Sequence, residues 1–241
     1  MSYSPGNSND AREQRKRVFD RFFIKCALRQ LFQVLKDHNQ AFVSGNDLEN
    51  MIINVQYFDA NSPGDCGRYF TPWTTEQMAK HAKNLRVGET HAEHQTRENR
   101  LDATIPFSER YFSQIPQWND QWESQFHWTL PGQPHIKICM CSSIDGDPKQ
   151  ILRTELLTIV ATMGTLLNQA DFQHHMAIPV MLISFMGRWR GRILTAYCKG
   201  PELVVRMSRL YRFLSQDVDS MSLVTRYLAS YADGETHELP T

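Results

Sequence analysis

Near its N-terminus the chain has apolar residues at three- and four-residue steps, the spacing that places side chains on one face of an α-helix. The positions with this spacing are Phe19, Phe22, Phe23, Cys26, Leu28, Leu31, Phe32 and Leu35. Asp10 and Glu13 precede them at the spacing of a capping box, which marks a helix start. We therefore predict a long N-terminal helix with a broad apolar face, after a disordered segment over residues 1–10.

Two shorter helices are predicted next, and then the pattern fades. The segment "SGNDLENMIINVQYF", residues 44–58, predicts a second helix after a Ser-Gly-Asn turn. Thr74 and Gln77 have capping-box spacing and predict a third helix that ends near Arg86. From there to about residue 128 the sequence is polar with scattered tryptophans, so we expect a long aromatic-rich connection. Residues 11–128 would thus form a helical half.

The second half of the chain shows the two-residue alternation of β-strands. "PHIKICMC" alternates in this way. Three later runs, "PVMLISFM", "GRILTAYC" and "ELVVRM", are joined by short glycine-containing connections typical of an antiparallel meander. Between these strands, Asp147 and Pro148 predict the start of an apolar helix over residues 148–168. A last amphipathic helix, "DSMSLVTRYLASY", and a loose acidic tail over residues 232–241 complete the chain.

These elements predict an α+β protein, in which N-terminal helices are followed by a largely antiparallel or mixed sheet backed by a helix. The α+β half would cover residues 129–231. From residue 135 onward, the order strand, helix, strand, strand is similar to the core of the restriction-endonuclease-like fold.

Composition adds little to this picture. The 241 residues include 26 basic and 26 acidic side chains, so the net charge is zero and predicts no partner by itself. The five cysteines have no regular spacing, and no apolar stretch has the length of a membrane span. We expect an intracellular protein, cytoplasmic or nuclear, with no membrane partner.

Local charge is uneven and directs attention to one hairpin. Residues 179–215 carry seven basic side chains and one acidic one, and "GRWRGR" joins two predicted strands within this region. Arginines can pair with phosphates while a tryptophan stacks on a base. The anion-binding candidates are Arg188, Trp189, Arg190, Arg192, Lys199 and Arg206. The alternative is that these side chains keep the hairpin soluble and form ion pairs with the acidic remainder of the chain.

Catalytic motifs are sparse. No Gly-rich phosphate loop, nucleophile elbow or zinc-type spacing occurs. A restriction-endonuclease-like site would need one acid on a strand and an acid-x-Lys pair on the next, to hold Mg²⁺. Here His135 stands before Lys137, so one acid is missing, and Asp120 and Glu123 are the candidate upstream acids. A Mg²⁺-dependent nuclease with a degenerate or cryptic site is therefore the alternative function.

Three segments carry a resemblance, namely "PVxxxSFMG", "GRIL.AY" and "LVVR.S..Y". Across about residues 126–230 the chain resembles a protein family common in filamentous fungi. The resemblance implies an intracellular fungal protein and implies no activity. Taken with the basic hairpin, the sequence favours a non-catalytic binding or interaction protein without a metal or cofactor. Its partner would be anionic, such as nucleic acid, or another protein.

Overall fold

The computed structural model describes residues 8–62, 65, 67–82, 122–130, 132–213 and 218–240, and the statements below concern these residues. The expectations for residues 1–7 and for most of the aromatic-rich connection, Asp120 included, lie outside them.

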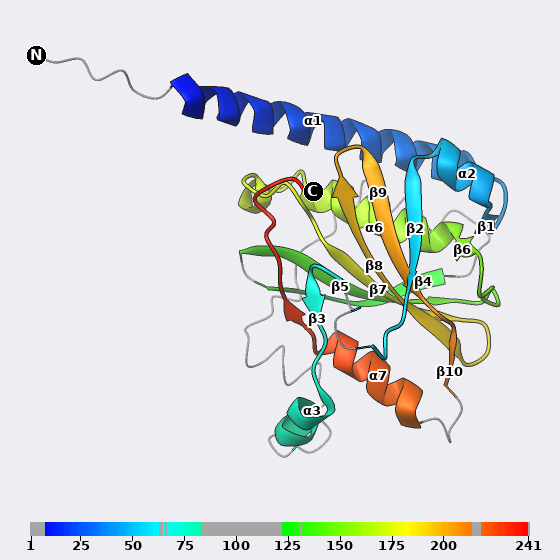
Figure 1. The fold of residues 1–241 in the computed structure, drawn as a ribbon. Helices are drawn as coiled ribbons and strands as arrows, with labels where there is room; N and C mark the ends of the chain where they lie inside the picture. The colour runs from blue at the N-terminus through cyan, green and yellow to red at the C-terminus, as the bar shows by residue number, and fades with distance from the viewer. Residues whose placement is uncertain are drawn as a thin grey trace, which may run out of the picture.

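The centre of the molecule is a mixed seven-stranded sheet (Figure 1). Its spatial order is β2 (Ile53–Phe58), β9 (Glu202–Ser208), β8 (Arg190–Lys199), β7 (Val180–Met186), β5 (Gln133–Ser142) and β4 (Trp122–Leu130), while β10 (Tyr211–Arg212) pairs with the start of β8. Strands β7, β8 and β9 form the predicted antiparallel meander. β2 runs parallel to β9, and β5 runs parallel to β7. The predicted α+β class with a helix-backed mixed sheet is confirmed.

Helices cover both faces of the sheet. α1 (Ser8–Asp37) and α6 (Arg153–Leu166) lie over one face, and α7 (Val218–Leu228) lies over the other (Figure 1). The alternation of β5 follows from these two layers, because Ile136 and Ile138 face α6 while Cys139 faces the α7 side. α6 is buried along its whole length between α1 and the sheet, and its buried Thr158 and Thr162 hydroxyls donate to carbonyls one turn earlier in the helix.

The predicted apolar face of α1 divides into two. The side that packs on the body consists of Ile24, Leu28, Leu31, Phe32 and Leu35. Phe19, Phe22 and Phe23, which we expected on this buried face, are instead exposed. The body contacts only one side of the helix, and no described segment covers the other. Every residue from 11 to 19 is exposed, and in Figure 1 this part of α1 extends past the body.

The predicted second helix is only partly correct. α2 (Gly45–Asn50) begins at the predicted turn, where the Ser44 hydroxyl accepts a hydrogen bond from the Asp47 amide. The helix then stops, and residues 53–58 form β2 rather than continuing it. β2 is a strand because its backbone pairs with β9, and its residues alternate between apolar and polar from Ile53 to Tyr57, a strand period that the helix prediction missed.

The long apolar helix starts later than predicted. Residues 151–152 form β6 (Ile151–Leu152), which pairs with β1 (Phe42–Val43), and α6 begins at Arg153. Asp147 closes a turn instead of capping the helix, since its carboxylate accepts from the amides of Lys149 and Gln150.

The C-terminal segment is held in place, in contrast to the loose tail we expected. β11 (Tyr231–Ala232) pairs with β3 (Phe70–Thr71), and the Thr236 carbonyl accepts from the amides of Met176 and Ala177. η1 (Ala170–Phe172) lies just before Met176 and Ala177 in the chain. α3 (Thr75–Ala82) has the predicted capping box between Thr74 and Gln77. The expected boundary at residues 128/129 falls inside β4.

Candidate functional site

The turn between β7 and β8 presents a tryptophan to solvent. Met186 pairs with Arg190, so residues 187–189 form the turn, and the Trp189 side chain is 67% exposed. Trp189 has a φ of 63°, in the left-handed region that costs a residue with a side chain about 1–2 kcal/mol. Its carbonyl accepts a hydrogen bond from the Phe213 amide at 2.7 Å, which helps to hold this conformation. The turn therefore keeps an aromatic ring in water at a position where glycine would be more stable.

Three arginines lie near Trp189 along the backbone. Arg188 is exposed, Arg190 is half-buried, and the exposed Arg212 lies directly opposite Arg190 in the pairing of β10 with β8. Like charges at directly opposite positions destabilise a strand pair. No salt bridge joins any of these three guanidinium groups to an acid within the described ranges. We call Arg188, Trp189, Arg190 and Arg212 the tip cluster.

One acid lies beside the tip cluster. The Asp145 carboxylate fills the space that a side chain on Gly187 would occupy. It reduces the local positive charge, but three arginines remain against one carboxylate, so the cluster is suited to an anion.

Arg192 does not belong to this surface, although the sequence placed it with Arg188 and Arg190. Its side chain is 1% exposed and forms a two-pronged ion pair with the buried Glu155 of α6, with 2.8 Å between Nε and Oε1. The remaining guanidinium nitrogen donates to the carbonyls of Asp147 and Gln150. All three of its guanidinium nitrogens donate to groups inside the protein, so Arg192 joins β8 to α6 and is not placed to bind a ligand.

Arg206 and Lys199 are also separate from the tip cluster. Arg206 donates to the Asp65 carboxylate and lies over the Phe58 ring, 5.1 Å from its centroid. Lys199 is exposed at the far end of the ten-residue strand β8, about 30 Å from its first residue at the rise of an extended strand.

The Lys137 amine is hydrogen-bonded to main-chain carbonyl groups. Its Nζ donates to the carbonyls of Leu228, at 2.9 Å, and Ser230, and burial lowers the pKa of this amine to about 7. Its neighbour on β4 is Trp128, whereas Glu123 lies opposite Cys141. His135 contacts the Asp233 carbonyl through Nε2 at 2.7 Å. Among the described residues, no group of three or more His, Cys, Asp or Glu side chains could hold a metal ion.

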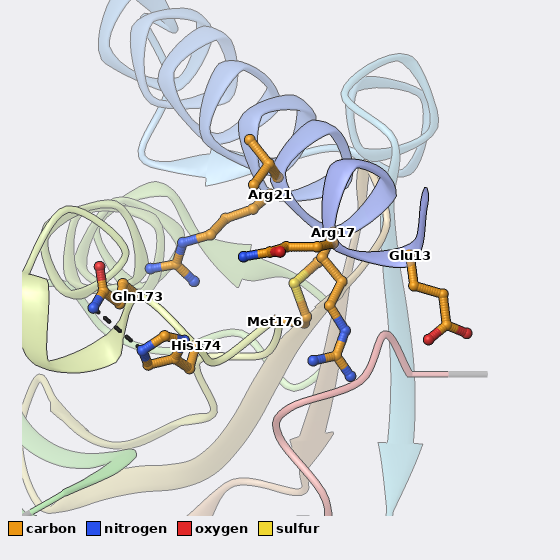
Figure 2. A pocket seen from close by; sticks show the side chains of 8 residues that line it. Glu13, Arg17, Arg21, Gln173, His174 and Met176 are labelled. Atoms are coloured by element: carbon orange, nitrogen blue, oxygen red, sulfur yellow. Dashed lines mark hydrogen bonds between the residues drawn. The ribbon is translucent and has the colours of Figure 1, made fainter. Parts of the chain in front are cut away.

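A cleft of about 520 Å³ lies where the N-terminal part of α1 meets the segment after η1 (Figure 2). Arg17 and Glu13 contribute one charge of each sign, and His174 contacts Gln173 across 3.2 Å. Arg21 donates to the carbonyls of Leu167, at 2.8 Å, and His175. Arg21 thus satisfies a carbonyl at the C-terminus of α6 and one after η1, so this cleft is a packing junction in which one of the two lining arginines is already bonded within the protein.

Comparisons of this chain with protein-family models, with curated proteins and with solved structures find no match. Within the described part of the chain, no helix has an apolar stretch long enough to cross a lipid bilayer.

The sequence did not point to Arg212 as a site residue. It lies far along the chain from "GRWRGR", in a two-residue strand with no periodic signal. Only the β10–β8 register shows that it is a neighbour of Arg190.

Proposed function

We propose that this protein is a non-catalytic binding protein whose tip cluster holds a single-stranded nucleic acid. The observation that carries the proposal is the solvent-exposed Trp189, held in a left-handed backbone conformation near three arginines that form no salt bridge within the described part of the chain. A tryptophan face stacks on any base, and guanidinium groups pair with phosphates. The backbone strain and the opposed arginines both destabilise the fold, and such costs concentrate at functional sites.

The alternative function, a Mg²⁺-dependent nuclease, is less well supported. In that reading Lys137 would position the attacking water. Its amine instead donates to two carbonyls at the end of α7, and the residue two positions earlier is a histidine that contacts another carbonyl. These contacts favour a structural role for both side chains.

The test measures binding of fluorescent single-stranded oligonucleotides to the full chain by anisotropy, as a function of salt. Replacing Trp189 with glycine should weaken binding about tenfold or more, since one stacked base is worth about 1–3 kcal/mol. The same substitution should raise the free energy of unfolding by about 1 kcal/mol, because the strain at this position is relieved.

The arginine contribution is tested by Arg188→Gln, Arg190→Gln and Arg212→Gln in one chain. This variant should lower the slope of log affinity against log salt by about two to three, close to one unit per lost phosphate contact. Lys199→Gln is the matched control, since Lys199 is exposed and distant from the tip cluster. The tip cluster would not be the binding site if Trp189→Gly bound with the affinity of the wild-type chain. The same would follow if Lys199→Gln lowered the salt slope as much as the triple variant.

A further inference from the structure

The outer face of α1 carries a second, separate feature. Phe19, Phe22 and Phe23 are between 53% and 61% exposed, and Val18 and Cys26 beside them are exposed as well. Their spacing places them together on the side of the helix opposite Ile24, Leu28 and Leu35, which pack on the body. α1 is therefore apolar on two opposite sides, whereas a surface helix normally has one apolar side.

The outer face of α1 carries basic residues beside its phenylalanines. Arg12, Arg15 and Lys16 each stand one heptad before one of the three phenylalanines, so they share the outer face with them. Arg29 continues the row of Phe22, and all four basic side chains are exposed. The acids Glu13 and Asp20 line clefts between α1 and the body, and Lys16 borders the second of these clefts as well as the outer face. The exposed charges beside the phenylalanines are all positive over this stretch.

An uncharged groove adjoins the same side chains. It has a volume of about 300 Å³ and lies between α1, the turn from α2 to β2, and the turn from β8 to β9. Its lining includes Phe23, Leu31, Val34, Ile52 and Pro201. Ile52 is 54% exposed and has a φ of 57°, a conformation rare for a β-branched residue. The turn from α2 to β2 thus exposes an isoleucine side chain beside the groove. The β7–β8 turn exposes Trp189 at the tip cluster in the same way.

We infer that the outer face of α1, with this groove, docks an amphipathic helix of a partner protein. The partner helix would be apolar on one side, to cover the three phenylalanines and the groove, and acidic near the end that meets Arg12, Arg15 and Lys16. Charge selects this occupant over a second copy of the chain, because two such faces would bring basic rows together. The inference is independent of the tip cluster, since β10 lies on the other side of the molecule from α1 (Figure 1).

The test uses two synthetic three-heptad peptides with leucine at the a and d positions. One peptide carries glutamate at the flanking positions and the other carries lysine. Binding of each to the full chain is measured by titration calorimetry. The glutamate peptide should bind at least about tenfold more tightly than the lysine peptide. Replacing Phe19, Phe22 and Phe23 with serine should abolish binding, and replacing Arg12, Arg15 and Lys16 with glutamine should remove the preference between peptides.

The serine variant should keep the wild-type unfolding transition, since these side chains are exposed. Val218→Ser, an exposed apolar position on α7, is the matched control and should bind like wild type. Equal affinity for both peptides, no binding, or binding retained by the serine variant would overturn the inference. Light scattering that shows a dimer for the wild-type chain and a monomer for the serine variant would overturn it as well. Binding to phosphatidylcholine–phosphatidylserine vesicles with none to the glutamate peptide would also overturn it, in favour of a lipid surface.

Discussion

Ile52 and Trp189 share an unusual combination of properties. Among the described residues they are the two other than glycine with a positive φ, and each exposes a large apolar side chain. An exposed turn with this backbone would be more stable with glycine or asparagine. At both positions the side chain therefore lowers the stability of the fold and leaves apolar surface exposed to water. They lie at the two surfaces for which we propose partners.

At the opposite extreme, Arg192 and Glu155 form an ion pair that water does not reach. Glu155 also accepts from the Leu152 amide at 2.8 Å, so it joins the start of α6 to β8. Replacing Arg192 with methionine should lower the free energy of unfolding by about 3–5 kcal/mol, because the Glu155 carboxylate would stay buried without its cation. Chemical denaturation measures this loss.

The control for this prediction is the double variant Arg192→Met with Glu155→Gln. It removes the unpaired charge and should recover part of the stability lost in the single variant. A single-variant loss below about 1 kcal/mol would mean that the pair is not buried in solution.

At the scale of elements, the C-terminal segment shows how a polar stretch without periodicity becomes ordered. Its hydrogen bonds go to histidines and to main-chain amides of the body. His135 contacts the Asp233 carbonyl, and Nδ1 of His175 lies 2.8 Å from the Thr236 hydroxyl. Burial lowers the pKa of His135 to about 4, and burial is also the main cause that lowers the pKa of His175.

These lowered pKa values predict that acid releases the segment. Between about pH 6.5 and pH 4 the unfolded chain binds more protons than the folded one at His135, so stability falls as the pH falls through this range. Through His135, the free energy of unfolding should fall by about 3 kcal/mol between these two pH values. The protection factors of the Met176 and Ala177 amides, which donate to the Thr236 carbonyl, should fall over the same range when exchange is compared with the intrinsic rate at each pH. His135→Phe should flatten the pH dependence, and an unchanged slope in this variant would contradict the assignment.

At the scale of the whole molecule, the two halves expected from sequence share one core. Leu28 and Leu35 of α1 belong to the same buried cluster as α6 and the sheet, and β2 is an edge strand of that sheet. Cutting the chain at residue 128 would also divide β4. The N-terminal segment is thus part of the fold and not an appendage to it.

A fragment of residues 129–241 should therefore fail to fold, because it lacks the α1 layer over α6 and the partner of β9. The full chain should unfold in a single cooperative transition by circular dichroism, and the fragment should show none. Adding residues 1–128 in trans is the control, since it restores the missing layer and should recover a transition. A fragment that unfolds cooperatively near the temperature of the full chain would show that the halves are independent domains.

The sequence by itself determined the elements whose signal lies within one stretch of chain. The alternation of "PHIKICMC", the glycine connections of the meander and the capping box of Thr74 and Gln77 each act over a few residues, so β5, β7 to β9 and the start of α3 were predictable. The same local periodicity indicated α1 as a helix.

Tertiary structure decided the rest, because those features depend on which distant segment lies alongside. Which strand residues 53–58 pair with is one such feature: their apolar–polar alternation is a local strand signal, but the parallel pairing with β9 is not contained in it. The phenylalanines of α1 have core spacing but face outward, since the body contacts the other side of the helix. Arg192, which the sequence placed at the anion-binding surface, instead pairs with the buried Glu155, while β10 brings Arg212, which the sequence did not indicate, to the exposed tip. Register between strands is a relation between segments, and periodicity within one segment does not contain it.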